Sequence, residues 1–367
     1  MKTVFKTSLT LACLVVFIVN IQAADYKSKR ILTKTFKATD NSTLSVSNEY
    51  GAINITEWDK NEVSFEVTIT ATAKKQADAD EIVKTANVNF AQSGNMITAK
   101  TTYSNLKNCN CSRSVDYQIM VPKNIHYQLK NGYGNIAMGN AKGKVLVAVE
   151  YGNFKGADLS GDENMIKIEY GNIDVQRLTG NSNSIKAEYA GNINIGTSNN
   201  LSVKMEYSKM KVGTTTNLEI KSEYSDLSVQ KAKTFTFASE YENYTIGEVD
   251  VLEGKAEYTN VVIGQLNKAL VMPIIEYGKL DIKNVSSSFE TINVKAAYTP
   301  VDVKFETGTS FNVNATTQYG TVSVSGNSKV SKTSRDNKVT VVGKVGSNDS
   351  PKASVIITNE YSLINLK

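Results

Sequence analysis

A short pattern of apolar and polar positions recurs along most of the chain around a tyrosine, which usually follows a glutamate. Ahead of Tyr170, for example, apolar residues occupy every second position, at Ile166 and Ile168. Beyond this tyrosine the alternation continues with the opposite parity, at Ile173 and Val175. Alternation with a period of two is typical of a strand with one buried face, so each copy predicts two strands. The change of parity predicts a corner between them, because only a corner lets both apolar sets face one core.

The spacing of the tyrosines predicts how these strand pairs are arranged. The tyrosines recur every 17 to 21 residues, at Tyr133, Tyr151, Tyr170, Tyr189, Tyr207, Tyr224, Tyr241, Tyr258, Tyr277, Tyr298 and Tyr319. Tyr361 follows 42 residues later, so we expect one intervening coil without a tyrosine near residues 339–342. A period of about twenty residues is the signature of a solenoid, whose coils stack in parallel at about 4.8 Å. The predicted fold class is therefore all-β, a parallel β-solenoid with coils of 17–21 residues.

Two features of the corner can be predicted from the residue types. Glycine follows several of the tyrosines, and glycine tolerates the positive φ that a tight corner requires. These glycines are Gly134, Gly152, Gly171, Gly278 and Gly320. The tyrosines share the parity of the apolar positions that precede them, so we expect their rings to point into the core and to stack there. The alternative is an exposed aromatic ladder that grips a sugar chain.

The N-terminal part of the chain lacks the regular repeat and predicts two further units. Residues 1–23 combine early lysines with an apolar run that ends in small residues, which predicts a secretory signal peptide. Residues 24–128 predict a β-rich cap together with the first coil, because a solenoid must cover its open terminal edge. Within this region, residues 74–86 form the one convincing helical stretch. The solenoid repeats then occupy residues 129–367.

Charge and composition offer little of the chemistry that enzymes use. The formal net charge is +5, with lysine and glutamate interleaved and no basic patch, which argues against nucleic acid as a partner. His126 is the only histidine, and we expect it on the surface or in a loop. Cys109 and Cys111 predict a local disulfide or two cysteines in a flexible loop, with metal binding as the remaining alternative. We therefore predict no catalytic residue, no cofactor and no metal site.

Several segments together resemble a known family. In chain order they are the stretch "NEYGAINITEWDKNEVSFEVTITATAKK", the helical stretch after it, "VDYQIMVP" and the run of "EYGNI" coils. They resemble the adhesin-like β-strand repeat proteins of Gram-negative envelopes, a domain family of unknown function related to the head domains of autotransporter adhesins. Relatives often have Asn-Gly-Asp-Ile where this chain has Tyr-Gly-Asn-Ile. The resemblance implies a right-handed β-solenoid and no established activity.

Two functions from different classes fit these features. The first is an exported, non-catalytic protein of the cell envelope, an adhesin-like scaffold that contacts a glycan or an envelope or surface protein. The second is a polysaccharide-acting β-helix enzyme, but such enzymes gather acids and bases in a groove built by long loops. The short, uniform turns of this chain favour the first function. We expect the mature chain in the periplasm, on the outer-membrane surface or secreted, with no transmembrane segment.

Overall fold

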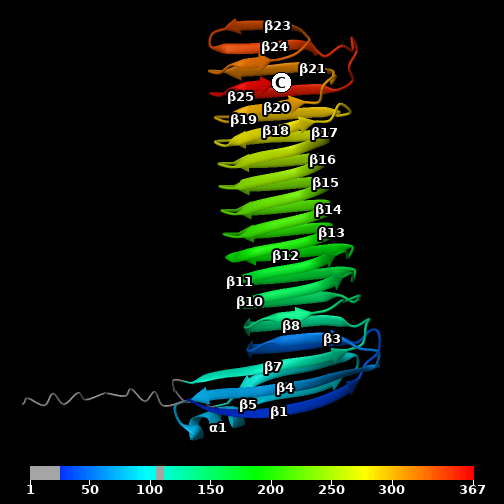
Figure 1. The fold of residues 1–367 in the computed structure, drawn as a ribbon, viewed down its shortest axis with the longest axis vertical. Coiled ribbons are helices and arrows are strands. Elements are labelled where there is room, and N and C mark those ends of the chain that lie inside the picture. Colours follow the sequence, from blue (N-terminus) through cyan, green and yellow to red (C-terminus); the bar gives the residue numbers. More distant parts are fainter. Residues whose placement is uncertain (1–24, 105–110) are drawn as a thin grey trace, which may run out of the picture.

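The long, narrow shape of the molecule comes from the stacking of one β-coil on the next along a single axis (Figure 1). The computed structural model describes residues 25–104 and 111–367, so the predicted signal peptide lies outside the described residues. The described residues are nearly all β, with strands β1 to β26 in one hydrogen-bonded sheet and one short helix, α1. The solenoid has about nine turns, which confirms the predicted fold class.

The central coils pair in parallel with the coil before and the coil after. Tyr151 lies opposite Tyr170, and Lys186 lies opposite Lys204. A residue type that recurs in the sequence therefore lies directly above its own kind and forms a column. The strands concerned are β8 (His126–Tyr133), β9 (Ile136–Met138), β10 (Val145–Leu159), β11 (Glu163–Leu178), β12 (Ser182–Glu188), β13 (Ala190–Glu206), β14 (Lys209–Glu223), β15 (Asp226–Glu240), β16 (Asn243–Glu257), β17 (Asn260–Glu276), β18 (Lys279–Val285), β19 (Thr291–Ala297) and β20 (Val301–Phe305).

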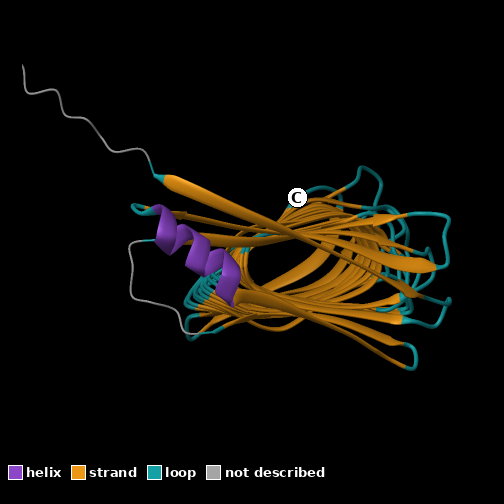
Figure 2. Cartoon of the chain, turned by 90° about the horizontal axis from the view of Figure 1, so that it is seen from below, coloured by secondary structure: helices purple, strands orange, loops and turns teal. Residues whose placement is uncertain are grey.

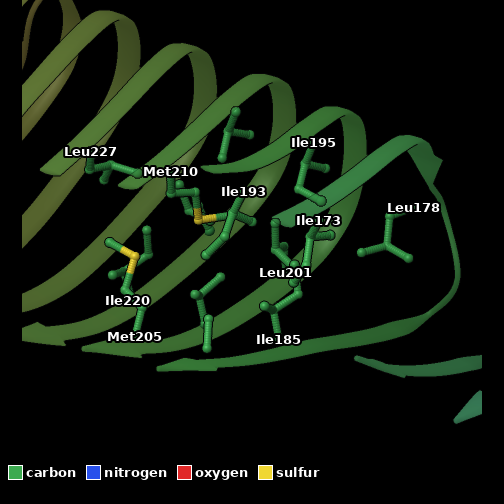
Figure 3. Packing of buried hydrophobic residues seen from close by; sticks show 14 of the residues in the cluster. Ile173, Leu178, Ile185, Ile193, Ile195, Leu201, Met205, Met210, Ile220 and Leu227 are labelled. Carbon is green, nitrogen blue, oxygen red and sulfur yellow. The ribbon is translucent and has the colours of Figure 1, made fainter. Parts of the chain in front are cut away.

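The core is a continuous apolar column enclosed by the two walls of each coil (Figure 3). Ile193 and Met210 stack from the wall that follows the tyrosine corner, and Ile185 and Ile220 face them from the wall that precedes it. All four side chains are buried. Burying an aliphatic side chain of this size contributes about 1.5–3 kcal/mol, so the alternating apolar positions hold the two walls together.

The N-terminal end is closed by strands that are out of chain order. The coil formed by β2 and β3 lies beneath β8 and β9, and the layer formed by β6 and β7 lies beneath that coil. β4 pairs antiparallel with β7, β1 with β4, and β5 with β6. The strands are β1 (Tyr26–Lys37), β2 (Thr43–Tyr50), β3 (Ile53–Glu57), β4 (Glu62–Ala73), β5 (Ala86–Ser93), β6 (Met96–Tyr103) and β7 (Ser112–Val121).

Helix α1 (Gln76–Thr85) covers the outer end of these strands (Figure 2). Its buried side is formed by Ala79, Ile82 and Val83, and the helix packs against β1 and β4. The helix lies within the predicted stretch, residues 74–86. In the part of the chain that the structure describes, no helix is long and apolar enough to cross a membrane.

The C-terminal end differs from the prediction. The prediction of a further coil near residues 339–342 is wrong. This segment belongs to a hairpin, and one strand of the hairpin pairs antiparallel with β21. The alternation of a hairpin strand is the same as that of a coil, so the pattern alone could not separate the two. The strands are β21 (Phe311–Gln318), β22 (Val322–Val324), β23 (Ser328–Arg335) and β24 (Lys338–Val345).

The last strands of the chain enter the stack between two earlier coils. β25 (Ser354–Glu360) pairs in parallel with both β19 and β21, and β26 (Ile364–Leu366) pairs with both β20 and β22. The final coil therefore lies beneath β21, β24 and β23 and is not the outermost layer (Figure 1). Residue 367 therefore lies inside the stack. The coil that starts with β21 covers β25, and the hairpin of β23 and β24 covers β21.

Candidate functional site

One corner of the solenoid carries an unbroken column of stacked tyrosines, which we call the tyrosine ladder. In spatial order its members are Tyr50, Tyr133, Tyr151, Tyr170, Tyr189, Tyr207, Tyr224, Tyr241, Tyr258, Tyr277, Tyr298, Tyr361 and Tyr319. Neighbouring ring centroids lie 4.6 to 5.1 Å apart, and the ring planes differ by 1 to 10°. Twelve intervals of about 4.8 Å give a continuous aromatic stripe about 58 Å long.

The prediction that these rings point into the core is wrong. The ladder tyrosines from Tyr133 to Tyr319, together with Tyr361, are 42 to 51% exposed. The reason is the backbone conformation, since Tyr207 has a φ of 49° and Tyr224 a φ of 51°. A left-handed residue turns the chain so that the glutamate and the tyrosine both face outward, and the next residue faces inward. The positive φ recurs at Tyr189, Tyr207, Tyr224, Tyr241, Tyr258, Tyr277, Tyr298, Tyr319 and Tyr361.

The first coils make the corner with glycine, as expected, but the later ones do not. Gly134 has a φ of 143°, and a Cβ there would lie 2.1 Å from the carbonyl oxygen of Gly51. Gly278 and Gly320 were also expected to supply positive φ, and this is wrong, because Tyr277 and Tyr319 adopt it instead. A left-handed tyrosine costs more than a left-handed glycine. Ring stacking offsets part of that cost, since an aromatic pair contributes about 0.5–1.5 kcal/mol.

Short polar side chains brace the inner side of the corner. Ser208 Oγ accepts a hydrogen bond from the Ala190 backbone N–H at 3.1 Å, and Ser225 Oγ accepts one from the Ser208 N–H at 3.1 Å. Thr299 Oγ1 likewise accepts from the Gly278 N–H at 3.2 Å. These hydroxyls accept hydrogen bonds from backbone N–H groups that, because of the corner, have no partner in the neighbouring strand. They fix the tyrosine of one coil relative to the next.

Stacking decides which part of each ring is available to a partner. The faces of the rings cover one another, so the exposed parts are the ring edges and the hydroxyl groups. Partial desolvation raises the pKa of Tyr170 and Tyr241, and the neighbouring phenols and glutamates raise it further. These two hydroxyls therefore stay protonated at neutral pH, and a protonated phenol can both donate and accept hydrogen bonds.

A column of acidic residues runs beside the ladder, one position before most of the tyrosines, and it is interrupted at Gly132, Ala297 and Gln318. Lys167 Nζ lies 2.8 Å from Glu169 Oε1, and Lys186 Nζ lies 3.1 Å from Glu188 Oε1. These ion pairs are at the surface, where each contributes between about 0 and 1 kcal/mol. The column therefore serves mainly to keep the flank of the ladder polar.

Stacked asparagines flank part of the ladder on its other side. Asn172 Nδ2 donates to Asn153 Oδ1 at 2.7 Å, and the Asn153 backbone N–H donates to Asn135 Oδ1 at 2.9 Å. The Asn192 N–H donates to Asn172 Oδ1 at 2.9 Å. In these coils the ladder is thus a ridge of ring edges between a row of carboxylates and a row of amides.

A shallow groove of about 280 Å³ lies next to the ladder on its acidic side. The lysine column three positions before the tyrosines forms one wall, and it is interrupted at Ala238. The groove is lined by Lys204, Met205, Glu206, Lys221, Ser222, Glu223, Ala238, Ser239, Glu240, Lys255, Ala256 and Glu257. The groove and the tyrosine ladder run side by side, parallel to the solenoid axis.

Sequence reasoning missed one buried polar cluster directly behind the ladder. Glu242 is 2% exposed and occupies the inner corner position that Ser208 and Ser225 occupy in earlier coils. Its Oε2 accepts a hydrogen bond from Ser222 Oγ at 2.7 Å, and Ser222 Oγ is also bonded to the Tyr244 hydroxyl. Burial raises the pKa of Glu242 to about 7. The signal in the sequence was a glutamate where serine or threonine follows the tyrosine, but it is informative only once the corner is placed correctly.

The remaining candidate residues lie elsewhere. Cys109 lies outside the described residues, and Cys111 is disulfide-bonded, so the local pairing of these two cysteines stays a prediction. His126 is half-buried and its Nδ1 accepts the Lys144 backbone N–H at 2.9 Å, which gives it a structural role. Within residues 25–104 and 111–367, no group of three or more His, Cys, Asp or Glu side chains could hold a metal ion.

The exposed position of the tyrosines predicts a small stability effect. Replacing Tyr207 with asparagine should change the free energy of unfolding by about 1–3 kcal/mol at most, because two stacking contacts are lost. Asparagine tolerates the left-handed conformation better than other non-glycine residues, so the corner itself should persist. Chemical denaturation measures the change, with Tyr207→Ala as the variant that also strains the corner. A loss of about 4 kcal/mol or more, as for a buried aromatic side chain, would contradict the exposed position of the ring.

Several solved structures that are weakly similar to this chain have names that refer to adhesion or binding. A "putative adhesin" from Parabacteroides merdae is 9% identical, with 92% of this chain and 96% of that chain covered and a TM-score of 0.33. A "putative cell adhesion protein" from Clostridium sporogenes is 12% identical, with 93% and 99% covered and a TM-score of 0.20. A "putative lipid binding protein" from Parabacteroides distasonis is 12% identical, with 69% and 96% covered and a TM-score of 0.28. No protein-family model and no curated protein matches the sequence.

Proposed function

We propose that this chain is an exported, non-catalytic binding protein of the cell envelope, and that the tyrosine ladder is its contact surface. The observation that carries the proposal is the uninterrupted exposure of the ladder from Tyr133 to Tyr319. Large exposed aromatic side chains gathered in one stripe mark interaction sites more often than singly scattered ones do. The core of the solenoid does not need these rings, because the apolar columns fill it without them.

The chemistry of the stripe favours an extended polar partner, and we propose a polysaccharide chain. Ring faces that are stacked on one another cannot stack on a sugar, so recognition has to use the hydroxyl-bearing edges. Those edges repeat at about 4.8 Å, and carboxylates and amides flank them. A polymer with regularly repeated hydroxyl groups can satisfy such a row along its whole length. Summing many weak contacts along one chain gives useful affinity without a deep pocket.

The non-catalytic part of the proposal is supported by the position of the acids. Glu242 is the acid whose pKa burial raises to about 7, and it is buried behind the corner, where a polymer cannot reach it. The exposed glutamates of the acidic column share one repeated environment. A pair of carboxylates with different environments, as general acid and base catalysis requires, is not found among the described surface residues of this corner.

Removing two hydroxyl groups from the ladder tests this function. The double variant Tyr224→Phe, Tyr241→Phe keeps both rings and should weaken polysaccharide binding by about 2 kcal/mol, since each lost hydrogen bond contributes about 1 kcal/mol. The matched control is Ser228→Ala, Thr245→Val, which removes two exposed hydroxyls from the same coils on the other wall. Binding is measured first on an array of plant, animal and bacterial polysaccharides and then by calorimetry.

Three outcomes of this experiment would overturn the proposal. Retention of no polysaccharide by the native chain would remove the proposed ligand class. An equal effect of the two double variants would remove the ladder as the contact surface. Release of new reducing ends from a bound polysaccharide, abolished by replacing a single Asp or Glu, would replace the binding protein with a polysaccharide-acting enzyme.

A further inference from the structure

The ladder brings together side chains that react with one another when they are oxidised. We propose that the tyrosine ladder is a site of oxidative cross-linking, in which neighbouring rungs couple through the ring carbons beside their hydroxyl groups to form dityrosine. The modification would join consecutive coils of the solenoid covalently. It requires no ligand, and it therefore stands or falls independently of the proposed polysaccharide binding.

The first observation behind this proposal is the proximity of the rings. The ring centroids of Tyr224 and Tyr241 are 4.9 Å apart, and those of Tyr241 and Tyr258 are 4.7 Å apart. Both pairs are parallel to within 4°. A ring that has been oxidised therefore has a stacked tyrosine in contact, on both sides for every rung except the two at the ends of the ladder. Holding two reactants in contact replaces a bimolecular encounter with an intramolecular step.

The second observation is that an oxidant in solution can reach the reacting part of each ring. The face of each ring is covered by its neighbours, whereas the edge that carries the hydroxyl faces the solvent, and each of these three rings is 46 or 47% exposed. Coupling also requires the two rings to twist out of the parallel arrangement, and the exposed edge of each ring leaves solvent on one side for that movement.

The balance of the reaction is simple. A one-electron oxidant, such as a haem peroxidase with hydrogen peroxide, removes an electron from each of two phenols, and each phenol releases its hydroxyl proton. The two phenoxyl radicals combine, one carbon–carbon bond forms, and one hydrogen moves from each coupled carbon to its oxygen. The net change is the loss of two electrons and two protons per link. The released protons pass to the solvent, which the exposed side of each ring contacts.

The chain contains its own controls for this chemistry. Tyr26 is 51% exposed, but no stacked ring accompanies it among the described residues. Tyr117 and Tyr127 are buried in the N-terminal part of the core. If exposure alone decided the outcome, Tyr26 would react like a rung of the ladder. If stacking decides it, links should join only tyrosines that are consecutive in space, including the pair Tyr298 and Tyr361, which are distant in sequence.

The experiment is photo-oxidation of the full chain at low concentration with tris(bipyridine)ruthenium(II) and persulfate, a one-electron oxidant. Dityrosine fluorescence gives the yield, and mass spectrometry of proteolytic peptides gives the positions. We expect monomers that have lost two hydrogens per link, with links between consecutive rungs such as Tyr207 and Tyr224. The variant Tyr189→Phe, Tyr224→Phe, Tyr258→Phe keeps the stack but removes every second phenol. In this variant the yield of dityrosine links should fall among the rungs from Tyr170 to Tyr277 and stay unchanged among the other rungs.

Each alternative result is decisive. Links that join Tyr26 to another chain as often as they join neighbouring rungs would show that exposure alone governs the reaction, and would overturn the proposal. An unchanged yield in the triple phenylalanine variant would overturn it as well. Circular dichroism shows whether that variant is folded, and if it is not, the corresponding asparagine variant, which also preserves the left-handed corners, replaces it.

Discussion

The free energy of unfolding is expected to fall by about 3 kcal/mol between pH 4.5 and pH 7 because of one side chain, Glu242. In the unfolded chain this carboxyl group ionises near its ordinary pKa of 4.5, whereas in the folded protein burial keeps it protonated until about pH 7. Within this interval the folded state binds the additional proton, so its stability declines as the pH rises. Below pH 4.5 the contribution of Glu242 to the free energy of unfolding is complete, and above pH 7 this contribution is lost.

The surroundings of Glu242 allow this effect to be isolated from other titrations. Asp226 adds a negative charge that raises the pKa further, while hydrogen bonds from Ser222 and Tyr244 lower it in part. The variant Glu242→Gln keeps the shape of the side chain but cannot ionise, so the difference in stability between native and variant chains should grow by about 3 kcal/mol across the interval. Urea denaturation at several pH values measures this difference. Glu240→Gln, an exposed change two residues away, is the matched control, and parallel pH profiles for native and Glu242→Gln would refute the expectation.

Removing the last strands of the chain should have the largest effect on the structure. Deleting residues 350–367 takes β25 and β26 out of the gap between two coils, and with them four buried aliphatic side chains, including Ile357 and Ile364. Truncating even one such side chain to alanine costs about 2–5 kcal/mol. We expect β21 to β24 to lose their fold, because their parallel partner has gone. The coils from β10 to β16 should stay folded, since a solenoid coil contacts only its neighbours.

Hydrogen exchange measured by mass spectrometry distinguishes these regions directly. In the truncated chain, peptides from residues 311–345 should exchange at the rate of an unfolded chain, while peptides from residues 145–257 should keep their native protection. The point variant Ile357→Ala provides a milder test with the full chain present. Native protection of β21 to β24 after truncation would show that these strands do not need β25, and loss of protection throughout would show that the solenoid folds as a single unit.

The sequence was sufficient to predict the solenoid because its signals are local and repeated. Alternating apolar positions and regular spacing identify two strands and a corner in every coil, and more than ten copies reinforce the inference. The orientation of the tyrosines could not be predicted in the same way. The alternation is the same whether Tyr207 faces inward or the residue after it does. The tyrosine faces outward both where it is left-handed itself, as at Tyr207, and where the following glycine is, as at Gly171. The outward position brings the rings of successive coils into contact, and that stacking is a tertiary interaction.

The spatial order of the coils at the two ends also could not be predicted from the local pattern of apolar positions. β25 has the same alternation as any other coil, and nothing in it indicates that it lies between β19 and β21. β24 has a similar alternation and yet runs antiparallel as part of a hairpin. Pairing partners that are distant in the sequence are decided by the total packing of the end of the stack. The buried Glu242 belongs to the same class, because its environment consists of side chains from two neighbouring coils.

The insertion of β25 and β26 has a consequence for how the protein is made. A solenoid whose coils stack in chain order can fold as it is synthesised, each turn settling on the one before. Here the turn that starts at Phe311 has no finished surface to settle on until Leu366 has been synthesised, because the last residues form the layer beneath it. This end can therefore assemble only after residues 354–366 have been synthesised and have left the ribosome. A chain that stalls before β25 is made would retain most of its coils and still lack a closed end.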